Sequence, residues 1–69
     1  MDLNIELLKK TVEAIIKSDF ALSLDGTLSD EYRSQIKAEG TALTLVVEMI
    51  NNADFLDTMA KIYKVDLQN

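Results

Sequence analysis

The sequence predicts an all-α protein: a small three-helix domain, or a helical hairpin with one long second helix, that assembles as a helical-bundle homodimer. Three observations predict this class. Apolar residues recur three and four positions apart over most of the chain, which is the period of an α-helix. The 69 residues include no proline and only two glycines. The densest apolar run, residues 41–50, has Glu48 as its one charge, so a helix there needs cover on several sides.

A first helix is expected over residues 3–24, with Asn4 or Asp2 as its N-cap. Its apolar stripe consists of Ile5, Leu8, Val12, Ile15 and Leu22. Asp19 falls where this repeat places another core residue. Because aspartate is seldom buried without a partner, we expect Asp19 at an end of the stripe that solvent reaches, and a buried residue that specifies helix pairing is the alternative.

Asp25 and Gly26 are expected to end this helix, since glycine adopts the left-handed conformation without a steric penalty. Ser29 suits the N-cap of a second helix, and so short a connection predicts an antiparallel hairpin. The segment between the helices also resembles the middle of an EF-hand calcium loop. It carries Ala21 and Tyr32 where that loop needs an aspartate and a glutamate, so we predict no calcium site.

The second helix is expected over residues 30–50. Its main apolar stripe consists of Tyr32, Ile36, Leu43, Val47 and Ile50. Gly40 lies inside it, where glycine costs about 1 kcal/mol relative to alanine. Two interpretations compete: Gly40 lets another backbone approach closely, or it marks a kink. We favour the close approach.

A third helix is expected over residues 54–66, after Asn51 and Asn52, because asparagine serves both as a left-handed C-terminal residue and as an N-cap. Apolar positions nevertheless keep the helical period across this break, with no proline or glycine in between. One continuous helix from residue 30 to residue 66 is therefore the alternative.

Composition excludes several kinds of chemistry. The chain has no cysteine and no histidine, so the familiar catalytic triads, zinc sites and thiol chemistry are unavailable, and we predict no enzyme, no cofactor and no metal. A net charge of -5 makes nucleic acid an unlikely partner and leaves nucleic-acid mimicry as a minor possibility. No apolar run approaches the roughly 20 residues that span a membrane, and no signal-peptide pattern is present, so we expect a cytoplasmic protein.

Short length without disulfide or metal support favours self-association, so we predict a homodimer. The predicted function is that of a non-enzymatic protein-binding module, a small adaptor or inhibitor presenting a helical surface. A structural or assembly subunit acting through self-oligomerisation is the alternative. The residues predicted to form the partner or dimer interface are Gly40, Leu43, Val46, Val47, Ile50, Phe55, Met59 and Tyr63. For Phe55, Met59 and Tyr63 the competing interpretation is the protein's own core.

Overall fold

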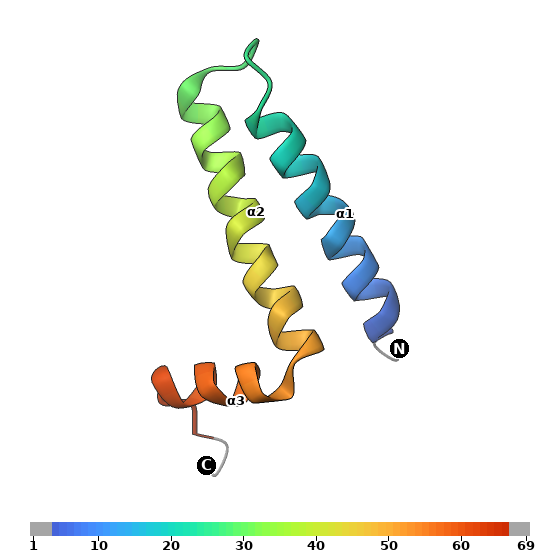
Figure 1. The fold of residues 1–69 in the computed structure, drawn as a ribbon, viewed down its shortest axis with the longest axis vertical. Helices are drawn as coiled ribbons and strands as arrows, with labels where there is room; N and C mark the ends of the chain where they lie inside the picture. Colours follow the sequence, from blue (N-terminus) through green and yellow to red (C-terminus); the bar gives the residue numbers. More distant parts are fainter. Residues whose placement is uncertain (1–3, 67–69) are drawn as a thin grey trace.

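The computed structural model describes residues 4–66, which form three helices and no strand (Figure 1). Helices α1 (Ile5–Ser23) and α2 (Asp30–Asn51) lie side by side and antiparallel. Helix α3 (Ala53–Ile62) lies across the end of α2 and points away from α1. The predicted all-α class with three helices is confirmed. The predicted start at residue 3, and Asp2 as a cap, lie outside the described residues.

Each helix begins at a side chain that caps it. The side-chain oxygens of Asn4, Ser29 and Asn52 accept hydrogen bonds from the backbone N–H three residues later, at 3.0, 3.1 and 3.1 Å. These bonds satisfy N–H groups that have no partner within the first turn of a helix. The starts of all three helices are therefore encoded locally.

The turn between α1 and α2 does not use glycine as predicted. Neither glycine has a positive φ, and α1 is capped instead by Leu24 in a right-handed conformation. The carboxylate of Asp25 accepts hydrogen bonds from the Thr27 hydroxyl at 2.6 Å and from the Thr27 N–H at 2.9 Å, which lowers the pKa of Asp25. A side-chain turn thus replaces the left-handed glycine, because aspartate can imitate a backbone turn through its own oxygen.

Helices α2 and α3 are separated by a single residue. Asn52 is extended, with φ -137° and ψ 100°, so one continuous helix is not formed. Its side chain caps α3, and this local hydrogen bond competes with continuing the helical hydrogen-bond pattern of α2. At its other end α3 stops at Ile62, four residues before the predicted end, where Lys64 adopts a left-handed conformation with φ 56°.

The seam between α1 and α2 contains the buried residues. Among the described residues Val12 is the one buried apolar side chain, at 8% exposure, and Asp19 is buried about two turns further along α1. Asp19 does not lie at a solvent-reached end as predicted, because it faces Gly40 of α2 at close range. A Cβ added at Gly40 would lie 3.3 Å from Cβ of Asp19 and 3.4 Å from Cζ of Phe20. Gly40 therefore makes the room that a buried Asp19 occupies.

The protomer exposes more surface than a compact chain of its size. Its accessible surface is 5727 Å², whereas a compact monomer of 7.7 kDa has about 4,300 Å². The radius of gyration is 15.1 Å, compared with about 11 Å for a compact domain of this length. The excess of about 1,400 Å² is surface that a more compact fold would cover.

Candidate protein-binding surfaces

Helical register defines an apolar surface on one side of the hairpin. Leu22 follows Asp19 on α1 by three residues, and Leu43 follows Gly40 on α2 by three residues. Three residues turn a side chain by about 60° around the helix axis. Because the two helices face each other and run in opposite directions, these two rotations place Leu22 and Leu43 on the same side of the hairpin.

Heptad spacing repeats this arrangement along the seam. Seven residues before Leu22 on α1 comes Ile15, and seven residues after Ile36 on α2 comes Leu43. The antiparallel direction places three pairs at nearly the same levels. We call these six residues the hairpin face: Leu22 with Ile36, Ile15 with Leu43, and Leu8 with Ile50.

Within residues 4–66 no helix covers the hairpin face completely. Leu8 and Ile15 are 39% and 40% exposed, and the other four residues are half-buried. The adjoining side of α1 carries no charge and is exposed; it consists of Leu7, Thr11, Ala14, Ser18 and Ala21. Apolar residues at heptad positions are typical of the packed interior of a helical bundle. The hairpin therefore presents half of such an interior.

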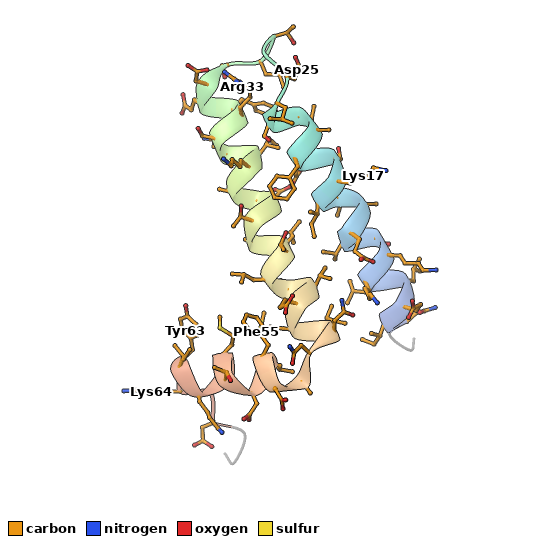
Figure 2. All side chains as sticks on the ribbon, viewed as in Figure 1. Lys17, Asp25, Arg33, Phe55, Tyr63 and Lys64 are labelled. Atoms are coloured by element: carbon orange, nitrogen blue, oxygen red, sulfur yellow. The ribbon has the colours of Figure 1, made fainter. Side chains whose placement is uncertain are left out.

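A second apolar surface lies in the angle between α2 and α3. Phe55 and Tyr63 extend from the side of α3 that faces this angle (Figure 2). Phe55 and Met59 are half-buried there, and Tyr63 is 72% exposed. Among the described residues α3 contacts α2 and makes no contact with α1. We call this area, together with Leu45 at 44% exposure, the corner surface.

A shallow groove along α2 ends at the corner surface. It is lined by Ser34, Lys37, Ala38, Thr41, Ala42 and Leu45, and its volume is about 520 Å³. Its lining is mostly apolar, and the small side chains of Ala38 and Ala42 allow an approaching side chain to reach the helix backbone. Lys37 provides a positive charge at the end of the groove away from α3.

Two carboxyl groups meet where the helices cross. Asp19 is 5% exposed, and its Oδ2 has no hydrogen-bond partner. The pKa of Glu39, on the neighbouring turn of α2, is raised because protonated Glu39 hydrogen-bonds with Asp19 and because the charge of Asp19 repels its ionised form. A buried acceptor without a partner costs about 1–3 kcal/mol, so this pair is a source of instability.

The predicted interface residues fall into three groups. Gly40 and Val47 face α1 of the same chain, and Gly40 is buried. Leu43 and Ile50 belong to the hairpin face, and Val46 lies next to it at 37% exposure. The predicted residues of α3 belong to the corner surface: Phe55, Met59 and Tyr63.

Sequence reasoning missed the contribution of α1 to the uncovered surface. Leu8, Ile15 and Leu22 were assigned to the apolar stripe of the first helix without a side of the hairpin. The signal that identifies them is the matching heptad on α2, at Ile36, Leu43 and Ile50. The groove along α2 was also missed, because Ala38 and Ala42 are too small to stand out in an apolar pattern.

Two of the basic residues are paired with aspartates. Arg33 pairs with Asp30 at the start of α2, and Lys61 pairs with Asp57 on α3 at 2.9 Å. Arg33 lies at the loop end of the hairpin, near Asp25 (Figure 2). Arg33 and Lys61 thus each have a carboxylate beside them, which weakens their attraction for a phosphate backbone.

Within residues 4–66 no group of three or more carboxylate side chains is placed to hold a metal ion. None of the helices described is long and apolar enough to cross a membrane. No protein-family model, curated protein or solved structure matches this chain. A function must therefore be argued from the two apolar surfaces.

Proposed function

We propose that this chain is a non-enzymatic protein-binding module, a small adaptor or inhibitor that works as a homodimer and presents the corner surface to another protein. The uncovered apolar side chains carry the proposal: among the described residues Val12 is the one buried apolar side chain, and the chain exposes about 1,400 Å² of surface, polar and apolar together, beyond what a compact chain exposes. A specific interface covers about 800 Å² on each partner. The excess is large enough for one such interface and part of another.

The corner surface suits a partner helix with an apolar stripe and acidic ends. Met59 and Tyr63 offer an adaptable and an aromatic side chain, the types enriched at the centres of interfaces. Lys37 lies at one end of the adjoining groove and Lys64 at the far end of α3, in a chain whose net charge is -5 (Figure 2). Acidic residues on the partner would meet these two lysines, and apolar residues would fill the angle between them.

Catalysis and nucleic-acid binding fit the chain less well. Its side chains include no imidazole and no thiol, and the paired carboxylates Asp19 and Glu39 lie at a helix crossing, with Asp19 closed to substrate. Two of the candidate phosphate-binding cations are neutralised by aspartates. The proposal places the protein in the cytoplasm, as the cysteine-free composition suggests.

Site-specific photocrosslinking tests the proposal. Benzoylphenylalanine replaces Tyr63 in the full chain, in the cells that produce it, and the control carries the same residue at Lys17, on the outward side of α1 (Figure 2). We expect an adduct with a different protein from position 63 but not from position 17. Adding Leu45→Glu, which puts a charge in the corner surface, should abolish it. Equal adducts from both positions would contradict the proposal.

A structural or assembly subunit remains a second candidate, because the hairpin face is an independent apolar surface with bundle-like spacing. It predicts that position 63 crosslinks to further copies of this chain and to nothing else. The masses of the adducts therefore distinguish the two functions.

A further inference from the structure

The hairpin face lacks a third layer of structure. In a helical bundle, residues at heptad positions on neighbouring helices fill one another's gaps, and each level of the core receives a side chain from every helix. Among the described residues each level receives side chains from α1 and α2 and from no further helix, because α3 points away from α1 and does not contact it. The described residues thus supply two of the helices that such a core needs.

We propose that a second copy of this chain covers the hairpin face with its own hairpin face, so that α1 and α2 of two protomers form a four-helix bundle. Ile15 and Leu43 form its central level. This inference rests on the homodimer in the proposed function and names the surface through which it forms. It differs from the sequence-based expectation by making α1 an equal partner and by excluding α3.

Three observations favour a second copy over an unrelated partner. The face consists of apolar pairs at three evenly spaced levels. A two-fold axis through its centre therefore places Ile15 and Leu43 of one copy against the same two residues of the other copy, and each outer pair against an outer pair. The adjoining side of α1 carries no charge, so a second hairpin can lie over that helix without removing a charged group from water, and the carboxylate beside the face belongs to Glu39 on α2. The total surface is also compatible with an interface, because the chain exposes about 1,400 Å² beyond a compact monomer and a standard interface takes about 800 Å² from each partner.

The arrangement leaves the corner surface free. Because the corner surface lies between α2 and α3, beyond the side of α2 that faces α1, pairing through the hairpin face does not cover it (Figure 1). A dimer formed this way carries two corner surfaces, and it can hold two copies of the partner at once. Linked sites of this kind strengthen binding to a multivalent target without any new contact.

Two matched substitutions test the inference by sedimentation equilibrium of the full chain. Ile15→Glu and Leu45→Glu place the same charge at side chains of almost equal exposure, 40% and 44%, one on the hairpin face and one on the corner surface. We expect the wild type and Leu45→Glu to have twice the 7.7 kDa of one chain, and Ile15→Glu to raise the dissociation constant by at least about 30-fold.

The outcomes separate this inference from the proposed function. A wild type that stays monomeric at all concentrations overturns both the inference and the homodimer. If Leu45→Glu dissociates the dimer and Ile15→Glu does not, the homodimer stands and the hairpin face is the wrong surface. If the masses are as expected but photocrosslinking at position 63 fails, the inference stands and the binding function does not.

Single cysteines provide a test that does not depend on a destabilising charge, because the natural chain has none. Chains with Ile15→Cys and Leu43→Cys are oxidised separately and as a mixture, with Lys17→Cys as the control on the outward side of α1. Faster disulfide formation between chains than in the control supports the central level. Whether like or unlike cysteines pair shows which helices are adjacent. If disulfides form no faster than in the control in either variant or in their mixture, the proposal is overturned.

Discussion

The seam between α1 and α2 buries Val12, Asp19 and Gly40, whereas α3 buries none of its residues. Yet α3 is the most strongly amphipathic of the three helices, with its apolar and polar residues on separate sides. The hairpin helices find full cover for some residues within the chain, whereas α3 finds only partial cover against α2. An amphipathic pattern therefore identifies the side of a helix that needs cover, but not the molecule that supplies it.

A charged residue in the seam should have the largest effect on the free energy of unfolding. Val12→Asp puts an unpaired carboxylate at a site that is 8% exposed, and we expect it to cost at least about 3 kcal/mol, enough to unfold a domain of this size. Circular dichroism should show α3 melting together with the hairpin. Tyr63→Ala, at a 72% exposed site, should change the free energy of unfolding by no more than about 0.5 kcal/mol. Similar losses in both variants would mean that α3 is as integral as the seam.

A larger side chain at position 40 should have the next largest effect on the free energy of unfolding. In Gly40→Leu the side chain meets Asp19 and Phe20, and we expect a loss of about 1–3 kcal/mol in urea denaturation, with the hairpin forced apart. Gly40→Ala is the control, because its Cβ fits at 3.3 Å with a small adjustment and alanine favours the helix by about 1 kcal/mol. A fully stable Gly40→Leu would refute the close approach.

Removing the N-cap of α3 should destabilise this helix without affecting the seam. Asn52→Ala removes the hydrogen bond that the Asn52 side chain accepts from the Phe55 N–H, and we expect it to cost α3 about 1 kcal/mol. Amide hydrogen exchange should accelerate in α3 and remain unchanged in the seam. Asn4→Ala removes the equivalent cap of α1 and should instead weaken the hairpin, so the pair of variants compares the two regions directly.

The smallest expected effect is a pH dependence of the seam. The pKa of Glu39 is raised above its ordinary 4.5 in the folded chain, so its contribution to stability is present at low pH and is lost as pH rises through the raised value. Glu39→Gln should therefore stabilise the protein near neutral pH and have less effect at acidic pH. Urea denaturation of both proteins between about pH 4 and pH 7 measures the difference. A difference that does not grow with pH would mean that Asp19 and Glu39 do not interact.

The three helices and two of their caps could be predicted because these depend on neighbouring residues. Ser29 was the expected cap of the second helix and Asn4 one of two candidates for the first, and both side chains accept the hydrogen bond of an N-cap. The end of α1 could not be assigned correctly, because aspartate and glycine can both make the turn and Asp25 does so here.

The burial of Asp19 could not be predicted either, because it depends on a glycine 21 positions away. General experience places an isolated aspartate in solvent, and only the pairing of α1 with α2 reveals that Gly40 leaves space for it. The hairpin face was hidden for the same reason. Its two halves are visible in the sequence as separate heptads, but register and direction are needed to place them on one side.

Asn52 has a mechanical consequence. One residue, Asn52, separates the end of α2 from the start of α3. The orientation of α3 is therefore set by the φ and ψ angles of this residue, and no other residue of the connection can absorb a change in it. A partner that turns α3 as it binds exerts a torque on the last turn of α2, which contains Ile50 of the hairpin face. If hairpins pair as proposed, binding at the corner surface and pairing of the hairpins would act on the same turn of α2. Any effect of one on the other must be reciprocal, so a partner that tightens the dimer is itself held more tightly by the dimer.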